Sequence, residues 1–321
     1  MIKNNTDTGR AFEYACLQVF YKTIKEKRPA SIDKTSSVNV SEKCYLALSQ
    51  EQQALMNLAA RSTVDTIFDL EPMILDGDDI LTLSIQPDKK GIAGDVRDIL
   101  ITRKGVKWEI GFSLKHNHFA VKHSRLSPTI DFGDKWYGHP CSEQYFQDIL
   151  PLFRRLRVLK SENKNWEDIP NKADVVYKPL LQAFLDELQR AYDQNKDIPA
   201  KLVEYLLGEY DFYKVISIEN QRITQLQAFN LHSSLSKQTK TRRSKIKIPK
   251  TLLPDRIVDM EIAPSKNEKG EVNTVNIYLN NGWQFSLRIH NASKRVEPSL
   301  KFDIQISGMP TSIMKLDCMW Q

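Results

Sequence analysis

Residues 94–118 of the chain are GDVRDILITRKGVKWEIGFSLKHNH, and this stretch carries the clearest strand pattern in the sequence. An apolar run follows Asp98, a polar turn comes at 103–105, and a strictly alternating segment ends at Lys115. Because successive side chains of a strand point to opposite faces, the alternating segment places its large apolar residues on one face. The pattern predicts a β-hairpin whose other face carries Glu109, Ser113 and Lys115.

The polar residues of this hairpin are of the types that phosphodiester hydrolysis requires. Asp98 heads the first strand, and Ser113 stands two residues before Lys115 on the second. Carboxylates hold Mg²⁺, the metal ion offsets charge that develops on the phosphate, and a nearby lysine can orient or activate the attacking water. A solvated amphipathic hairpin would show the same alternation, so the hairpin alone leaves both interpretations open.

Several strings of the chain resemble a known family. The spacing from Asp98 to Ser113-Leu114-Lys115 resembles the PD-(D/E)XK nuclease signature. The string WEIGFSLKHNHFAVKHSRLS at 108–127 is similar to the corresponding segment of HaeIII-type restriction endonucleases, as are GRAFEYA at 9–15 and RIHNASKRVEPSLKFDIQISGMP at 288–310. The resemblance spans most of the chain, although the helical middle carries no diagnostic motif. It implies a Mg²⁺-dependent type II restriction endonuclease acting on the palindrome GGCC in double-stranded DNA, with a cognate DNA methyltransferase as its functional partner.

The chain departs from the superfamily pattern at two positions. Arg97 stands where the pattern has proline, and Ser113 stands where it has Asp or Glu. A hydroxyl is a weaker metal ligand than a carboxylate, so another side chain should supply the missing charge. The resemblance therefore implies a metal shell of Asp98 with Glu109 or Glu13, completed by the Ser113 hydroxyl.

Glu13 falls in a Gly-x-x-Phe-Glu pattern at 9–13. The pattern resembles one with which several nuclease families bring a helix carboxylate to the metal. A surface glutamate in the first turns of a helix, favoured by the helix dipole, is an equally simple interpretation. Lys115 is expected to position or activate the hydrolytic water, with no covalent enzyme intermediate.

The composition is that of an ordinary soluble globular protein. With 321 residues, 41% hydrophobic and 27% charged, the chain can build one large or two modest domains. It has no run of about eighteen apolar residues and its first residues are polar, so we expect a cytoplasmic protein without a membrane partner. The cysteines Cys16, Cys44, Cys141 and Cys318 form no CxxC pair, which argues against a zinc ribbon or a disulfide scaffold.

The net charge of +6 is concentrated in one segment. Residues 237–250, which we call the basic segment, hold seven basic and no acidic residues, so the rest of the chain has 39 basic against 40 acidic residues. Such a segment suits phosphate contacts, because each neutralised phosphate releases condensed counterions. A solvated loop or linker is the alternative. The residues expected to contact DNA here are Lys240, Arg242, Arg243 and Lys245.

Two other segments are candidates for DNA contacts. The first follows the hairpin, where the string His-Asn-His invites comparison with HNH nucleases. We reject that comparison because consecutive residues of an extended chain point to alternate sides. A zinc site formed by the histidines of 116–139 has no thiol spacing to support it. The second segment lies near the C-terminus, where Arg and Asn can contact guanine and adenine edges, or where Arg288 forms an ion pair with Asp303 or Glu297. The candidates are Asn117, His118, Lys122, His123, Arg125, Arg288, His290 and Asn291.

Apolar periodicity predicts helices and strands along the rest of the chain. Helices are expected at 8–28, 52–69, 143–160, 179–195 and 199–208, with a bend at Pro151. Strands are expected at 81–86, 213–218, 222–231, 256–263, 274–280 and 283–290, with a tight turn at Asn281-Gly282. We expect an α/β (α+β) fold with a PD-(D/E)XK-like nuclease core at 1–210, in which helices flank a central mixed sheet, and a β-rich DNA-recognition region at 211–321.

Two other functions stay open. A structure-directed or repair nuclease with the same core would cut many sequences that lack the palindrome. A catalytically inactive DNA-binding protein would be explained by the serine at the acidic position. A Gly-rich phosphate loop, a GxSxG nucleophile elbow and cysteine metal motifs are all absent, which argues against ATP-driven enzymes, serine hydrolases and zinc fingers.

Overall fold

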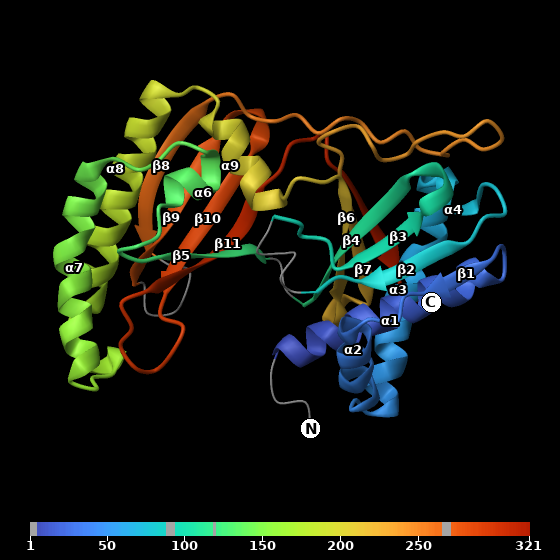
Figure 1. The fold of residues 1–321 in the computed structure, drawn as a ribbon, viewed down its shortest axis with the longest axis horizontal. Coiled ribbons are helices and arrows are strands. Elements are labelled where there is room, and N and C mark those ends of the chain that lie inside the picture. The colour runs from blue at the N-terminus through green and yellow to red at the C-terminus, as the bar shows by residue number, and fades with distance from the viewer. Residues whose placement is uncertain (1–4, 88–93, 118–119, 265–270) are drawn as a thin grey trace. The chain divides into compact units, whose positions relative to one another are not determined.

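The computed structural model describes residues 5–87, 94–117, 120–264 and 271–321, and the chain forms two compact units (Figure 1). Unit 1 consists of residues 1–119, 208–252 and 311–321, and unit 2 consists of residues 120–207 and 253–310. Each unit is built around its own sheet. Segments of the two units alternate along the chain. Their boundaries therefore differ from the single boundary that was expected at residue 210.

Unit 1 is built around a seven-stranded mixed sheet. In spatial order its strands are β1 (Ala30–Ile32), β2 (Leu81–Ile85), β3 (Ile99–Arg103), β4 (Trp108–His116), β6 (Phe212–Ile218), β7 (Ile223–Phe229) and β12 (Met314–Met319). The expected hairpin is confirmed, because β3 and β4 pair antiparallel with Ile101 opposite Ile110. β4 pairs parallel with β6, and the first segment of unit 2 connects these two strands. The hairpin therefore lies in the middle of the sheet.

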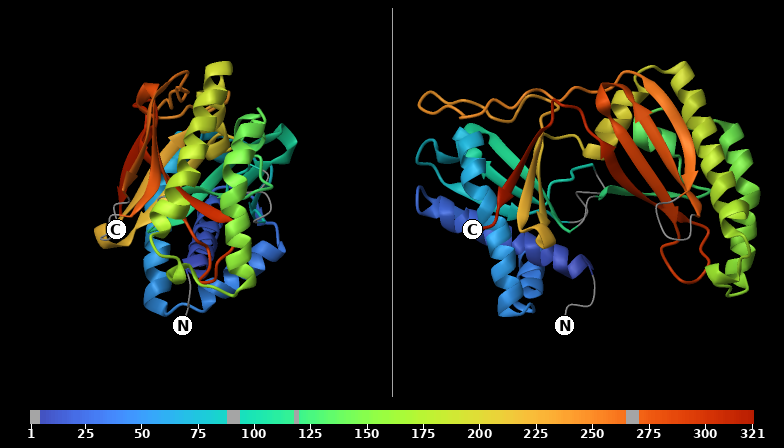
Figure 2. Two further views of the ribbon diagram at one scale, coloured as in Figure 1. Left: turned by 90° about the vertical axis from the view of Figure 1, so that its left-hand side faces the viewer. Right: turned by 180° about the vertical axis from the view of Figure 1, so that it is seen from behind.

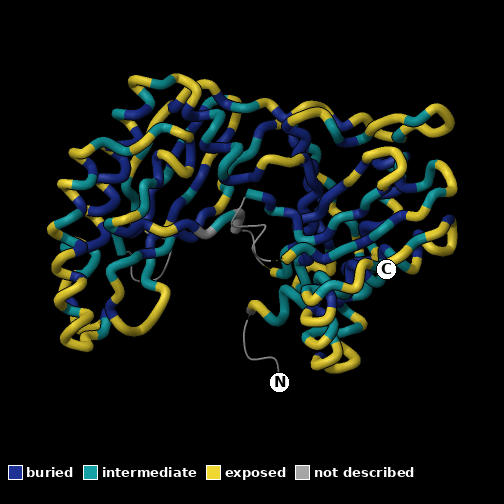
Figure 3. The backbone as a smooth tube through the Cα atoms, in the orientation of Figure 1, coloured by how far each residue is buried: buried dark blue, intermediate teal, exposed yellow. Residues whose placement is uncertain are grey.

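Helices pack on one face of this sheet. The helices of unit 1 are α1 (Asn5–Lys25), α2 (Ser36–Leu46), α3 (Gln50–Leu70) and α4 (Pro72–Leu75). α1 crosses β4, where the rings of Phe20 and Phe112 lie 4.9 Å apart. α3 begins at a capping box between Ser49 and Gln52, which satisfies backbone N–H groups that the first turn leaves free. Figure 3 shows the resulting buried core as dark blue along these strands and the inner sides of the helices.

Unit 2 contains a five-stranded antiparallel sheet. In spatial order its strands are β5 (Ala120–Leu126), β11 (Leu300–Gly308), β10 (Gln284–His290), β9 (Val272–Leu279) and β8 (Ile257–Pro264). The expected tight turn joins β9 to β10, and Asn281 and Gly282 there have φ of 59° and 87°. Asn and Gly tolerate this left-handed region better than other residues do. At the edge of the sheet β5 pairs with β11, with Leu126 opposite Leu300.

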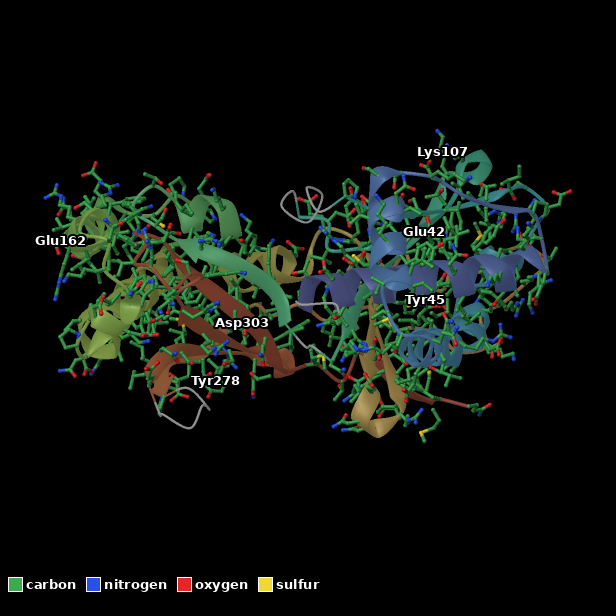
Figure 4. All side chains as sticks on the ribbon, turned by 90° about the horizontal axis from the view of Figure 1, so that it is seen from below. Glu42, Tyr45, Lys107, Glu162, Tyr278 and Asp303 are labelled. Atoms are coloured by element: carbon green, nitrogen blue, oxygen red, sulfur yellow. The ribbon has the colours of Figure 1, made fainter. Side chains whose placement is uncertain are left out.

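The helices of unit 2 lie on one face of its sheet (Figure 2). They are α6 (Phe132–Tyr137), α7 (Glu143–Ser161), α8 (Lys178–Gln194) and α9 (Ile198–Leu207), and the π-helical turn Ala173–Tyr177 precedes α8. Phe302 of the sheet packs here, with its ring 5.3 Å from Phe184 and 6.1 Å from Trp136. The opposite face carries polar side chains, among them Tyr278 and Asp303, which are labelled in Figure 4.

The expected helices and strands are confirmed, and so is the mixed α/β fold class. The structure adds α2, which lies in a polar stretch without clear periodicity, and the strands β5, β11 and β12. The difference in division has a physical cause: alternation identifies a strand but not the strand with which it pairs. Thus β6, β7 and β12 complete the sheet of unit 1, whereas β5 joins unit 2. No helix among the described residues is long and apolar enough to cross a membrane.

Candidate active site

Asp98 lies at the head of β3, and hydrogen bonds to both neighbouring strands fix its backbone. Its N–H donates to the Phe112 carbonyl at 2.7 Å, and its carbonyl accepts the Gln86 N–H at 2.8 Å. Both bonds continue the ladder that β3 forms with β4 and β2. A carboxylate on such a backbone is held in place before any ligand arrives, which favours a preorganised site.

The Asp98 carboxylate faces the polar side of β4. Asp98 Oδ2 accepts the Leu114 N–H at 2.6 Å and lies 3.4 Å from Lys115 Nζ and 3.5 Å from Ser113 Oγ. The Asp98 and Lys115 side chains are each 26% exposed, so solvent and a bound group can reach them. Asp98 Oδ1 accepts no hydrogen bond from the described residues. The fold thus brings together the three residues that match the PD-(D/E)XK spacing.

Arg97, at the position where the superfamily pattern has proline, is a buried cation. Its guanidinium donates to Asp95 at 2.8 Å and to Glu109 at 2.7 Å, and it lies 3.9 Å from the centre of the Tyr210 ring. A Cβ at Gly111 would come within 2.0 Å of Arg97 Cδ, so the strand needs glycine there. Arg97 therefore occupies the polar face of β4 between Glu109 and Ser113.

The expectation that Glu109 supplies the charge missing at Ser113 does not fit this geometry. The Glu109 carboxylate is already paired with Arg97 at 2.7 Å. Glu109 also precedes Ser113 by four residues on β4, which at the usual strand rise is about 13 Å. A single metal ion cannot contact two side chains so far apart.

Glu13 is the candidate that is not paired with Arg97. It lies on α1, the helix that packs on β4, and its Oε2 accepts a hydrogen bond from Ser41 Oγ at 3.3 Å. Burial raises the pKa of the Cys16 thiol, and the negative charges of Glu13 and Asp98 raise it further. Both carboxylates therefore lie within electrostatic reach of the same thiol.

Lys214 is a second lysine beside the hairpin that the sequence patterns did not single out. It lies on β6 opposite Ser113 in the parallel register, and it is 3% exposed. Burial lowers the pKa of Lys214 to about 7, the positive charge of Lys115 lowers it too, and Asp98 opposes the change. A lysine inside the buried run FYKVISI at 212–218 was the signal available in the sequence.

The donors around Asp98 suit a hard divalent cation. Mg²⁺ is usually bound by one or two carboxylates together with waters and substrate phosphates, rather than by an all-protein cage. Asp98 with its open Oδ1 and Glu13 provide carboxylates of this kind. Across residues 5–87, 94–117, 120–264 and 271–321, no group of three or more His, Cys, Asp or Glu side chains is arranged to hold a metal. The geometry therefore fits a cation that the substrate helps to bind.

The exposed Asn117 takes part in the turn that follows β4. Its Oδ1 accepts the Glu219 N–H at 3.0 Å, and its own N–H donates to the Ser217 carbonyl at 2.8 Å. With φ of 52° it forms the turn at the end of β4. His118, the next candidate, lies outside the described residues.

The candidates on β5 divide into engaged and accessible residues. Lys122 donates to the Tyr205 carbonyl at 2.8 Å and lies 3.6 Å from the centre of that ring, so its charge is used within unit 2. Arg125 is exposed and donates to Ser299 Oγ at 3.3 Å. His123 lies opposite Asp303 in the strand register. The structure describes the side chains of two candidate cations on β5, Lys122 and Arg125. Of these two, Arg125 is the accessible one.

On β10 the ion pair that the sequence left open is present. Arg288 Nη2 lies 3.3 Å from Asp303 Oδ2, directly across from it on β11. Burial and the charge of Arg288 lower the pKa of His290. Asn291 accepts the Tyr177 hydroxyl at 3.2 Å and donates to the Ser293 carbonyl at 2.7 Å. Asn291 therefore stabilises the loop after β10.

The basic segment is an exposed, irregular stretch of unit 1. Acidic residues of the same unit hold it in place. Thr239 and Thr241 both donate to Asp76, and Lys245 Nζ lies 2.9 Å from Asp69 Oδ1. Just before the segment, the Ser236 N–H donates to Glu71 Oε1 at 2.7 Å. These contacts fix the path of the backbone. They leave exposed the side chains of Lys240, Arg242 and Arg243.

Comparison with known proteins shows the family of the chain. The model of the family described as HaeIII restriction endonuclease matches residues 9–310, a range that includes most of α1, the Asp98 hairpin and the basic segment. The chain is 45% identical to the type II restriction enzyme HaeIII of Haemophilus aegyptius over 322 residues, which cover 100% of both chains. No solved structure matches the chain. The chain therefore belongs to the HaeIII restriction endonuclease family.

Proposed function

We propose that the chain is a Mg²⁺-dependent type II restriction endonuclease that hydrolyses phosphodiester bonds of double-stranded DNA at the palindrome GGCC. The observation that carries the proposal is the cluster of Asp98, Ser113 and Lys115 within 3.5 Å on the central hairpin. Metal-dependent hydrolysis needs a carboxylate that can hold the cation, a cationic side chain beside it can orient the water, and both are present here with part of their surface exposed.

Each residue of the cluster has a distinct task in this proposal. Asp98, whose Oδ1 is open, would hold the cation, with Glu13 as the proposed second carboxylate and the Ser113 hydroxyl as a neutral ligand directly or through water. Bound Mg²⁺ offsets negative charge on the scissile phosphate and lowers the pKa of a bound water. Lys115 orients the attacking water and stabilises charge that develops on the phosphate oxygens.

The exposed cations are assigned to the phosphates of the substrate in the proposal. Lys240, Arg242 and Arg243 of the basic segment and Arg125 on β5 contact phosphates, which positions the duplex without reading its sequence. Base reading is assigned to the polar face of the sheet of unit 2, where β10 contributes Arg288 and His290. Since Arg288 is paired with Asp303 at 3.3 Å, it must exchange that partner or share it when it contacts a base.

The target GGCC and the protecting methyltransferase follow from the resemblance to HaeIII-type enzymes. A site-specific nuclease would cut the DNA of its own cell unless its sites were modified. We therefore propose a cognate DNA methyltransferase as a functional partner that need not bind the chain.

Cleavage of two matched plasmids tests the proposal. One plasmid carries several GGCC sites, and in the other each site differs by one base. We expect discrete fragments from the first plasmid in Mg²⁺, and none from the second plasmid or in EDTA. A repair or structure-directed nuclease would cut both plasmids, and an inactive DNA-binding protein would shift their mobility in a gel without cutting either one.

A further inference from the structure

Unit 2 carries a basic surface that belongs neither to the hairpin site nor to the basic segment. We call it the α7 surface. It is formed by the C-terminal half of α7 and by the loop between β10 and β11. Its members are Arg154, Arg155, Arg157, Lys160, Lys294 and Arg295, and all six are exposed.

The amphipathic pattern of α7 directs these arginines to solvent. Tyr145, Ile149, Phe153 and Leu156 form its buried stripe, and they pack toward α8. At 3.6 residues per turn, Arg154 and Arg157 are neighbours on one side of the exposed surface of the helix, and Arg155 lies on its other flank. At the usual helical rise, Arg154 and Lys160 are separated by about 9 Å along the axis.

The loop after β10 is fixed against the end of α7. The Val296 N–H donates to the Lys164 carbonyl at 3.0 Å, and the Trp166 N–H donates to the Lys294 carbonyl at 3.1 Å. Arg295 Nη1 donates to Asn163 Oδ1 at 3.1 Å. These bonds hold Lys294 and Arg295 beside the basic end of α7, so the two halves of the surface form one rigid patch. Figure 4 labels Glu162, the residue at the C-terminal cap of α7.

The charge of unit 2 is uneven. Its residues 120–207 and 253–310 include 20 basic and 20 acidic residues, so the unit has no net charge. Glu162 and Glu297 also lie at this surface, so it holds six basic and two acidic residues, and the rest of the unit has 14 basic against 18 acidic residues. The α7 surface is therefore positive in an otherwise acidic unit, which gives it a directed field.

Structural stabilisation does not account for the three arginines. The helix dipole favours cations in the last turn, and of the basic residues in α7 only Lys160 lies there. Lys160 also pairs with Glu297 at 3.6 Å. In the described part of the chain, Arg154, Arg155 and Arg157 form no ion pair, and like charges three residues apart on a helix repel. An external anion would relieve that repulsion.

We propose that the α7 surface binds the sugar-phosphate backbone of double-stranded DNA, independently of sequence. Each strand of duplex DNA carries one phosphate per about 3.4 Å of the axis, so the 9 Å of α7 spans about three phosphates of one strand. The guanidinium group suits this task because its fork of donors matches phosphate oxygens. The inference rests on the proposed function for the identity of the polyanion, and it adds a second backbone-binding surface on unit 2 to the one assigned to the basic segment on unit 1.

Salt-dependent binding to a random-sequence duplex tests the α7 surface. The test variant is Arg154→Gln, Arg155→Gln and Arg157→Gln combined. Its matched control is Lys135→Gln, Lys178→Gln and Arg256→Gln, which removes the same charge from exposed residues elsewhere in unit 2. Binding is followed by fluorescence anisotropy in Ca²⁺, with a melting curve for each protein.

The test variant should bind more weakly than the unchanged chain. Its slope of log affinity against log salt should be shallower by about 0.9 for each phosphate that is no longer neutralised, up to about 2.7. Cognate and random duplexes should be affected alike, and the control should keep the original slope. A test variant with the original slope and a normal melting curve would overturn the inference, as would a control that weakens binding as much as the test variant does.

Because the readout is binding, it is separate from the test of cleavage. If the unchanged chain binds DNA without cutting it, the proposed endonuclease activity is refuted. The binding data would still show whether the α7 surface contacts DNA. Unchanged chain that does not bind duplex DNA at all would refute both, and would leave an acidic protein as the class of partner for this patch.

Discussion

Lys115 Nζ lies 3.4 Å from Asp98 Oδ2, at ion-pair distance, yet both side chains are 26% exposed. The two charges are held next to each other by strand geometry, since Asp98 Oδ2 also accepts the Leu114 N–H at 2.6 Å. An exposed ion pair contributes at most about 1 kcal/mol to stability, so this arrangement is not explained by a structural need. Its accessible oxygen and ammonium are better explained by catalysis.

Replacing Asp98 or Lys115 by alanine should lower the rate of cleavage by at least about 100-fold, because each substitution removes a group that acts on the metal or the attacking water. Specific DNA binding in Ca²⁺ should be largely retained. The control is Lys104→Ala, an exposed lysine in the turn of the same hairpin, which should cut normally. Full activity in either Asp98→Ala or Lys115→Ala would exclude this hairpin as the site.

Glu13→Gln and Glu109→Gln should separate the two candidates for the second carboxylate. We expect Glu13→Gln to reduce the rate at limiting Mg²⁺ and to recover in part at high Mg²⁺, because the variant has one metal ligand fewer. Glu109→Gln should cleave normally and lose no more than about 1 kcal/mol of stability, since its pair with Arg97 is partly exposed. Rates measured across a Mg²⁺ titration decide between them, and a normal titration for Glu13→Gln would exclude Glu13 as a ligand.

Glu71 should make the stability of the fold depend on pH. Burial raises the pKa of Glu71 from 4.5 to about 7, against the hydrogen bonds that Tyr213 and Ser236 donate to it. Between these pH values the folded chain holds a proton that the unfolded chain has released. The contribution of protonated Glu71 to the free energy of unfolding is therefore full below about pH 4.5. It declines as pH rises through 7, by up to about 3 kcal/mol.

Glu71→Gln should remove this decline, because glutamine cannot ionise and can still accept both hydrogen bonds. Urea unfolding at pH 5.5 and pH 8.5 measures the effect. The variant should gain stability relative to the unchanged chain at the higher pH. An equal difference between the two proteins at both pH values would show that Glu71 titrates near its ordinary value.

The basic segment should contribute affinity without specificity. Replacing Lys240, Arg242, Arg243 and Lys245 together by glutamine should weaken binding to cognate and random duplexes about equally, and each phosphate left without a cation should flatten the salt dependence by about 0.9. Lys245 is paired with Asp69, so we expect it to contribute least. Titrations at three salt concentrations measure this, and a selective weakening on the cognate duplex would assign base reading to the segment instead.

The sequence was sufficient for features that depend on neighbouring residues. Alternation in 108–115 predicted which face of β4 is buried, and the spacing from Asp98 to Lys115 predicted a contact that the strand register creates. The same local patterns could not assign β5 to unit 2, because its partner β11 is supplied by residues 300–308. Pairing over such a separation depends on the packing of the whole unit.

Site residues were harder to predict where their environment comes from another element. Glu109 was a plausible metal ligand from its position on the polar face of β4. In the structure the Arg97 side chain lies over Gly111 and pairs with the Glu109 carboxylate. Lys214 lies beside Ser113 only because β6 pairs parallel with β4 across the inserted residues 120–207. Asn117 is of a residue type that often contacts DNA, yet its side-chain Oδ1 accepts a hydrogen bond within a turn.

Sequencing the ends of digested genomic DNA tests the proposed site-specific cleavage most directly. DNA that lacks methylation at GGCC is incubated with the chain in Mg²⁺, and the Asp98→Ala variant serves as the control. We predict that the new ends map within GGCC at one fixed position, and that the control produces none. Ends that map to unrelated sequences, or equal cleavage by the control, would contradict this prediction.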